Sequence, residues 1–329
     1  MDKGSKNVQI AFITAFAIIL VVIGHADMTP VYDELWIKRW IYSFHMPLFV
    51  FISGFLFCYT TPKIESISLK FFLLKKAKRL LLPFLAINTI IFLIKTRFGN
   101  NDYVQHPVRM TVGSYIDSML FHPIGFMWFL PALFVIFLIV VFIAKQVRFA
   151  EEKYLTWLLL AVLFFVFSHF VGAINFMQIS TAIYYVGFFI FGIIYCLKKE
   201  YVDTLLLKYR FLTLLILFSI SALVLKYAIV AALIGILFAL SLSLVIGEKF
   251  NAKVVLFSNF SFTIYLLSYF PQMLIRGPIF HRFSEVNEYV FSICSIMLGI
   301  FIPLLIGSVC VKMKNKNSLT NFLINLIGL

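Results

Sequence analysis

The sequence predicts an all-α, polytopic integral membrane bundle of about ten transmembrane helices, with both chain termini in the cytoplasm. Of its 329 residues, 62% are hydrophobic and only 13% are charged. Soluble domains are closer to half apolar and a quarter charged, so this composition favours a lipid bilayer as the solvent. The apolar residues also occur in long runs separated by short basic clusters, which is the pattern of a helical membrane protein.

The apolar runs are close in length to the roughly 17–25 helical residues that cross a hydrocarbon core. A backbone in lipid must satisfy its own hydrogen bonds, so each run is expected to be a helix. In chain order the expected spans are 8–25, 41–59, 80–96, 126–144, 155–173, 182–197, 211–226, 228–246, 260–276 and 290–311.

The ends of the chain follow from the same pattern. The first run is followed by further spans, so we expect a retained helix and not a cleaved signal peptide. Residues 211–246 could be divided differently between two spans. Residues 1–311 are expected to form one transmembrane domain, followed by a short cytoplasmic tail at 312–329. The apolar end of that tail could be an interfacial helix.

The Lys and Arg residues in the connections predict the orientation. With the N-terminus inside, most of the 28 Lys and Arg residues fall on the cytoplasmic side, whereas the 14 Asp and Glu residues divide evenly. A bias confined to positive residues is what the positive-inside rule describes. The formal net charge of +14 therefore indicates orientation in a bilayer, and no nucleic-acid partner is expected. The four cysteines form no CxxC pair, so no metal site is expected.

Two histidines mark the outer ends of the first two spans. His25 closes the aliphatic run that begins at Ile18, and an ionisable residue at membrane depth is a candidate for function. His45 begins the second span, where a structural hydrogen bond at the interface is the simpler interpretation. Because the two spans run antiparallel, both histidines are expected near the outer face. His122 and His281, in outer loops, are given no role.

The densest basic cluster lies at the start of the third span and comprises Lys75, Lys76, Lys78 and Arg79. Orientation and contact with anionic lipid are sufficient to explain it. The alternative is a site for the phosphates of a cofactor that arrives from the cytoplasm. Trp128 begins the fourth span, a boundary where Trp commonly acts as an anchor.

In their order along the chain, these stretches resemble the acyltransferase-3 family of bacterial membrane O-acyltransferases. The Phe-His-Met-Pro sequence at His45 looks closest to the branch of polysaccharide O-acetylases, such as the fucose 4-O-acetylase type. The segments that carry the resemblance are Ile18–His25, Phe44–Phe49, Ile52–Phe55, the basic run to Arg79 and Pro83, Trp128–Leu130, and Asn259–Leu266.

The resemblance implies an enzyme of the bacterial cytoplasmic membrane. It implies cytoplasmic acetyl-CoA as the acyl donor, and a hydroxyl of a cell-surface polysaccharide or its lipid-linked precursor as the acceptor. His25 would be the general base, a role that contributes roughly 10²–10⁴-fold, although an acyl-histidine intermediate is an alternative. His45 would hold the acceptor or stabilise the oxyanion.

The other expected roles concern the two substrates. The CoA phosphates would bind Lys75, Lys76, Lys78 and Arg79, and the contacts to substrate would come from Asp27, Trp128 and Ser53. Asp27 could also orient the ring of His25. The basic cluster and His25 are expected on opposite sides of a hydrocarbon layer about 30 Å thick. We therefore expect a passage among the first four helices, near Ser53 and Gly54.

The sequence departs from the family pattern at three positions. Family members often carry an acidic residue and a cation where this chain has Ala11 and Thr14, and a late His where it has Ser268. These changes are compatible with a divergent substrate or with a catalytically inactive relative. A lipid-linked saccharide transporter or flippase would share the helix count, but such proteins often show broken helices in paired halves, and no such pairing is visible.

Overall fold

The computed structural model describes residues 8–26, 36–101, 104, 106–208, 210–223, 225–246, 251–283, 287–314, 320–321, 324 and 326–327. These residues form helices joined by turns and short loops, and no β-strand occurs among them. The all-helical prediction is confirmed for the described part of the chain.

The longer helices are α1 (Val8–Gly24), α2 (Trp36–Thr60), α3 (Leu69–Phe98), α5 (Phe129–Val147), α7 (Ile179–Leu197), α10 (Ala228–Ile246) and α15 (Glu288–Met313). The shorter α-helices are α4 (Val112–Leu120), α6 (Tyr154–Phe167), α8 (Lys199–Leu207), α9 (Arg210–Leu223), α11 (Asn251–Asn259), α12 (Ser261–Leu267), α13 (Tyr269–Leu274) and α14 (Phe280–Arg282). Single turns of 3₁₀-helix are η2 (Ile64–Ser66), η3 (Gly125–Trp128), η4 (Glu151–Lys153) and η5 (Phe176–Gln178), and η7 (Ile275–Ile279) is a π-helical segment.

Among the described residues, 6 helices are long and apolar enough to cross a membrane: α2, α3, α5 with η3, α7 with η5, α10 and α15. The number rises to 8 if two bent pairs of helices each form one span. One pair is α8 with α9, and the other joins α11 to the segment from α12 to α14. Helix α1 is apolar but has 17 residues, and α6 has 14. These helices support a membrane protein, while the count of ten spans and the cytoplasmic termini stay predictions.

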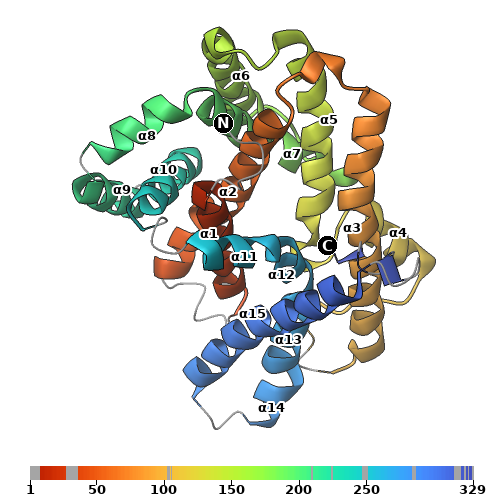
Figure 1. Cartoon of the computed structure of the whole chain (residues 1–329). Helices are drawn as coiled ribbons and strands as arrows, with labels where there is room; N and C mark the ends of the chain where they lie inside the picture. Colours follow the sequence, from red (N-terminus) through yellow and green to blue (C-terminus); the bar gives the residue numbers. More distant parts are fainter. Residues whose placement is uncertain are drawn as a thin grey trace.

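The centre of the bundle is the contact between α2 and α7 (Figure 1). A Cβ atom on Gly54 of α2 would lie 1.9 Å from the Phe189 carbonyl oxygen, and one on Gly192 of α7 would lie 2.0 Å from the Phe51 carbonyl oxygen. Glycine at both positions therefore lets the two backbones touch, as small residues do between membrane helices. Gly54, which we expected beside a passage, serves this helix contact.

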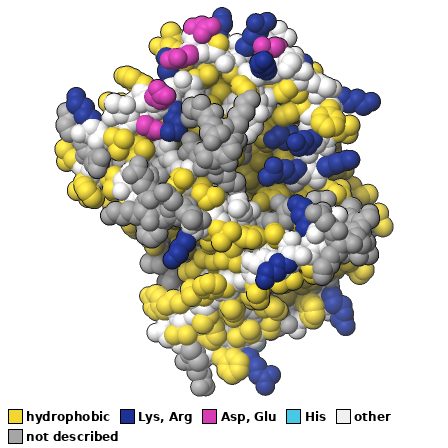
Figure 2. All heavy atoms as spheres, viewed as in Figure 1, with side chains coloured by type: hydrophobic (Ala, Val, Ile, Leu, Met, Phe, Trp, Pro, Cys, Tyr) yellow, Lys and Arg dark blue, Asp and Glu magenta, His cyan; other side chains and the backbone are white. Residues whose placement is uncertain are grey.

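The helix ends that the charge pattern places in the cytoplasm lie together. The Gln9 amide donates hydrogen bonds to Tyr195 Oη at 2.7 Å and to Asp203 Oδ1 at 3.1 Å, which joins α1 to α7 and α8. Lys198 donates to Glu151 at 2.7 Å, which joins the end of α7 to η4. Acidic and basic side chains gather at this upper end of the molecule, and the lower part of the same face is mainly hydrophobic (Figure 2).

Ile327, in the 312–329 segment, contacts α12. Thr263 Oγ1 donates a hydrogen bond of 3.0 Å to the Ile327 carbonyl, and Ile324 is buried. The division into a domain at 1–311 and a tail at 312–329 stays a prediction.

Candidate active site

A cavity of about 560 Å³ lies where α1 ends, at the opposite end of this helix from Gln9. Its walls come from the end of α1, the last turns of α3, the loop after α3, the segment that leads into α5, and α13 with η7. The polar and aromatic residues that line it include His25, Lys95, His106, His122, Trp128, Tyr269 and Arg276. Among the described residues of this lining, none is Asp or Glu.

His25 follows directly after α1, and its position depends on how that helix ends. The His25 backbone N–H donates to the Val21 carbonyl at 3.1 Å. Tyr42 Oη donates to the Gly24 carbonyl at 2.9 Å, so a carbonyl at the helix end finds a partner on α2. A Cβ atom on Gly24 would lie 3.0 Å from the Tyr42 ring. Glycine at position 24 thus lets Tyr42 approach and hold the end of α1.

His45 lies near the same end of the bundle but is buried within it. Its Nδ1 is 2.9 Å from the Ile41 carbonyl, which can only accept, so Nδ1 carries the proton and Nε2 of the neutral ring is left as an acceptor. The Tyr42 ring packs against both histidines, with ring centroids 5.0 Å from His45 and 6.2 Å from His25. His45 is not among the residues that line the cavity, and Tyr42 packs against the rings of both histidines.

The wall formed by residues 118–128 is held by two buried side chains. Asn88 of α3 donates to the Ser118 carbonyl at 2.9 Å and accepts from the Ile124 N–H at 3.0 Å. Tyr265 of α12 donates to the Phe126 carbonyl at 2.7 Å. The chain turns between these contacts at Gly125, whose φ of 60° suits glycine best. These bonds position the Phe126 and Trp128 rings at the cavity.

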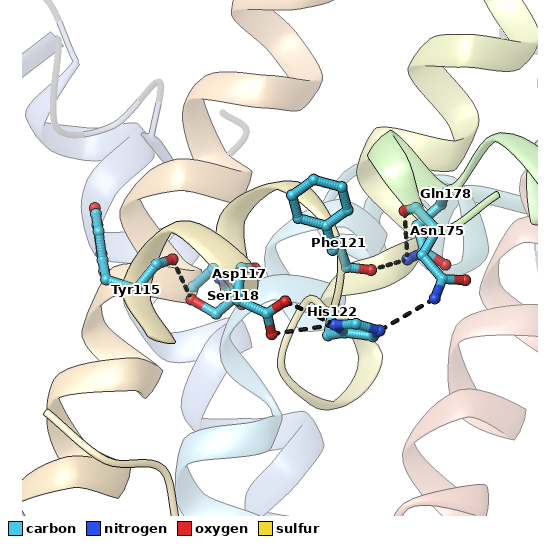
Figure 3. A network of polar contacts seen from close by, with 8 residues as sticks. Tyr115, Asp117, Ser118, Phe121, His122, Asn175 and Gln178 are labelled. Carbon is cyan, nitrogen blue, oxygen red and sulfur yellow. Dashed lines mark hydrogen bonds and ion pairs between the residues drawn. The ribbon is translucent and has the colours of Figure 1, made fainter. Parts of the chain in front are cut away.

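His122 lies in the same wall within a network of polar contacts (Figure 3). Its Nδ1 is 2.9 and 3.1 Å from the two carboxylate oxygens of Asp117, and its Nε2 is 3.1 Å from the Asn175 side-chain amide. With the Asn175 nitrogen as donor, Nε2 accepts and Nδ1–H donates to Asp117. Gln178 donates to the Phe121 carbonyl at 2.9 Å. The network therefore links the wall to η5 at the start of α7.

Two cations lie in the cavity wall on separate elements. Lys95 comes from the last turn of α3, and its Nζ is 3.5 Å from the His106 carbonyl. Arg276 lies in the π-helical segment η7, and its guanidinium carbon is 6.0 Å from the Tyr269 ring centroid. Pro278 in this segment has no N–H to donate, which accounts for the local departure from α-helical geometry. Such π-helical turns frequently occur at functional sites.

A family model described as an acyltransferase domain matches residues 8–308 of this chain. The chain belongs to the acyltransferase-3 family. The predicted family is thereby confirmed, and acyl transfer is the activity that this membership supports. The chain is also similar to the nodulation protein NolL of Mesorhizobium japonicum, with 30% identity over 142 residues. That match covers 41% of this chain and 35% of the relative's length. No solved structure matches the chain.

The basic cluster of this acyltransferase-3 protein lies outside the cavity. Lys75, Lys78 and Arg79 are exposed near the start of α3, while Lys76 is half-buried with its Nζ 3.7 Å from the Phe137 ring centroid. A helix rises 1.5 Å per residue, so the stretch of α3 from Arg79 to Lys95 is about 24 Å long. One helix therefore connects the cluster to the cavity.

Of the residues expected to contact substrate, Trp128 lines the cavity and Ser53 does not. Trp128 lines the cavity and stacks on Tyr185, with ring centroids 5.7 Å apart. Ser53 donates to the Phe49 carbonyl of its own helix at 2.9 Å and is not part of the cavity lining. Asp27 lies outside the described residues. The functional roles of all the predicted site residues stay predictions.

At two of the three positions where the chain departs from the acyltransferase-3 pattern, the side chain is buried. Ala11 and Ser268 are both buried. Thr14 is half-buried and donates to the Ile10 carbonyl of its own helix at 2.7 Å. None of the three lines the cavity. A role that the family assigns to a cation at position 14 would therefore fall to another residue here.

Three residues of the cavity lining, His122, Lys95 and Arg276, were not expected at the site from the sequence. The available signals were the long outer loop, with Asp117 five residues before His122, and the Arg-Gly-Pro interruption at Arg276 in an otherwise apolar span.

Proposed function

We propose that this protein is an O-acetyltransferase of the bacterial cytoplasmic membrane. It transfers an acetyl group from cytoplasmic acetyl-CoA to a hydroxyl of a cell-surface polysaccharide or its lipid-linked precursor. The observation that carries this proposal is the position of His25 in the wall of a cavity, within a chain of the acyltransferase-3 family. The cavity is in the size range of ligand sites, roughly 300–1,000 Å³.

In the proposed reaction the neutral His25 imidazole removes the proton from the acceptor hydroxyl. The hydroxyl oxygen then attacks the thioester carbonyl, a C–O bond forms, and the C–S bond breaks. The departing CoA thiolate takes the proton back from the imidazolium. A general base positioned in this way accelerates the step by roughly 10²–10⁴-fold.

Tyr42 and His45 are assigned positioning roles in this proposal. Tyr42 holds the Gly24 carbonyl and packs against the rings of His25 and His45. The His45 Nδ1–H donates to the Ile41 carbonyl, and this bond holds the imidazole ring in one orientation. The ring packs against one face of Tyr42 and restricts its position. Replacing His45 should therefore disturb His25 through Tyr42, with a smaller loss of rate than replacing His25 itself.

The donor is proposed to bind through its phosphates at Lys75, Lys78 and Arg79, whose side chains are exposed, with Lys76 beside them. Cations at exposed sites form charge-assisted hydrogen bonds with phosphate. The thioester must then reach His25 along the stretch of α3 that is about 24 Å long. Substitution of the cluster by Gln should raise KM for acetyl-CoA and leave KM for the acceptor unchanged. The control is Lys312→Gln, which removes a positive charge at the end of α15 and should leave both KM values unchanged.

The decisive experiment is His25→Ala in cells that carry the chain, with surface glycans analysed by mass spectrometry. Loss of one acetyl unit per modified sugar at unchanged protein abundance is expected. His169→Ala is the matched control, because His169 is exposed on the turn after α6 and its ring bonds only to the Phe165 carbonyl among the described residues. Full acetylation in the His25→Ala cells would exclude His25 as the base. Absence of acetyl transfer by the unaltered protein would favour an inactive relative.

A further inference from the structure

We propose that the cavity beside His25 binds an anionic group of the acceptor, a carboxylate or phosphate carried by the saccharide, through Arg276 and Lys95. This inference rests on the proposed function, since it names the class of acceptor that would reach the same base. It adds a substrate-binding role for two residues of the cavity lining that come from different elements, α3 and η7.

The lining of the cavity carries positive charge from Lys95 and Arg276. Arg276 and Lys95 are both half-buried, and both line the cavity beside His25. Among the described residues, Arg276 forms no ion pair, and no Asp or Glu belongs to the lining. A cation in a partly dry cavity loses hydration. An anion bound beside Arg276 would offset that cost.

The surroundings of Arg276 orient its guanidinium group. It lies in η7, where Gly277 and Pro278 also line the cavity. Its guanidinium is over the Tyr269 ring, a contact that orients a planar cation without using its hydrogen-bond donors. Arginine presents those donors in a rigid fork that matches carboxylate and phosphate. The Arg276 side chain forms no hydrogen bond with another described residue, so its donors are available to a ligand in the cavity that it lines.

The charge of the donor lies far from the cavity, so the cations in the cavity are not needed to bind it. The phosphates of CoA carry the donor's charge, and their proposed site at Arg79 is about 24 Å along α3 from Lys95. The acetyl thioester at the other end of the donor is uncharged. Cations beside His25 therefore suit a charge on the acceptor. The aromatic rings of Phe126, Trp128 and Tyr269 supply apolar wall beside them, as is usual where a few polar groups orient a ligand.

The binding test uses the full chain in lipid nanodiscs and two matched pairs of probes. Methyl glucuronide is compared with methyl glucoside, and glucose 1-phosphate with glucose, by ligand-dependent thermal stabilisation. At least one charged sugar should bind roughly 10-fold or more tightly than its neutral match, and the pair that shows this identifies carboxylate or phosphate. Equal binding of the charged and neutral sugars in both pairs overturns the inference.

The variants assign the preference to the two cations. Arg276→Gln and Lys95→Gln should each weaken binding of the charged sugar by roughly 10- to 100-fold and leave the neutral sugar unaffected. Arg276→Lys should restore part of the affinity, because it keeps the charge and loses the fork. Arg282→Gln is the control, since Arg282 is exposed on α14 and does not line the cavity. An unchanged charge preference in well-folded Arg276→Gln and Lys95→Gln protein would refute the assignment.

Kinetics distinguish this inference from the proposed function. If acetyl transfer occurs, Arg276→Gln should raise KM for a charged acceptor and leave KM for acetyl-CoA unchanged; the reverse pattern refutes the inference. Binding of charged sugars that depends on Arg276, without any acetyl transfer, would refute the function and keep the anion site. Equal acetylation of charged and neutral sugars would keep the function and refute the anion site.

Discussion

The buried side-chain amide of Gln272 donates a hydrogen bond of 2.8 Å to the backbone carbonyl of Val22, three residues before His25. This bond joins α13 to the end of α1. Arg276 lies one turn further along the same segment as Gln272. The bond therefore connects the cavity wall that carries Arg276 to the helix end that carries the proposed base, His25.

Replacing Gln272 should therefore affect the position of His25. Gln272→Leu leaves the Val22 carbonyl without this partner, at a cost of about 1–3 kcal/mol. We expect the rate of acetyl transfer to fall by about tenfold or more, with a smaller loss of protein from the membrane. The measurement is kcat in membrane vesicles, normalised to abundance. Gln146→Leu is the control, because Gln146 is exposed near the end of α5, and equal activities of the two variants would contradict the prediction.

Asn88 should matter for the acceptor side of the cavity. Asn88→Ala removes the partners of the Ser118 carbonyl and the Ile124 N–H, each at about 1–3 kcal/mol. The wall that carries His122 and Trp128 should loosen, which raises KM for the acceptor and lowers the thermal midpoint of the purified protein. Thr96→Ala, at a half-buried position of the same helix where the hydroxyl bonds only within α3, should leave both quantities unchanged. A normal acceptor KM in Asn88→Ala would show that this wall does not contact the acceptor.

His122 provides a test of which histidine is the base. It lies in the same cavity as His25, but both of its ring nitrogens face protein partners, Asp117 and Asn175. We expect His122→Ala to lower kcat by less than about tenfold, whereas loss of a general base costs roughly 10²–10⁴-fold. The measurement is kcat of His25→Ala and His122→Ala under the same conditions. A larger loss of kcat in His122→Ala would identify His122, and not His25, as the general base.

The glycine contacts in the core make a prediction about stability. Gly54→Ala and Gly192→Ala would each place a Cβ atom within 2.0 Å of a carbonyl oxygen on the facing helix. Overpacking of this kind typically costs about 1–3 kcal/mol, occasionally more, so the amount of folded protein in the membrane should fall. Gly172→Ala is the matched control, because nothing lies within 4 Å of its added Cβ. Wild-type amounts of folded Gly54→Ala protein would contradict the close contact.

Hydropathy was sufficient to predict the all-helical architecture of the described residues, while the membrane face to which His25 belongs stays a prediction. Apolar runs determine where spans lie, and Lys and Arg determine which ends share a side. His25 and Trp128 duly line one cavity. Neither signal reports which loop folds over which helix end, so the contributions of His122, Lys95 and Arg276 were missed. The roles expected for Gly54 and Ser53 depended on neighbours of α2 that its own periodicity does not identify.

The reciprocal contact of Gly54 with Phe189 and of Gly192 with Phe51 has a consequence for how substrates enter. Two helices that touch backbone to backbone at two points neither part nor slide without losing both contacts, so α2 and α7 move as one body. No described residue of α2 or α7 lines the cavity beside His25, so the walls of that cavity can shift to admit a substrate while both glycine contacts stay closed.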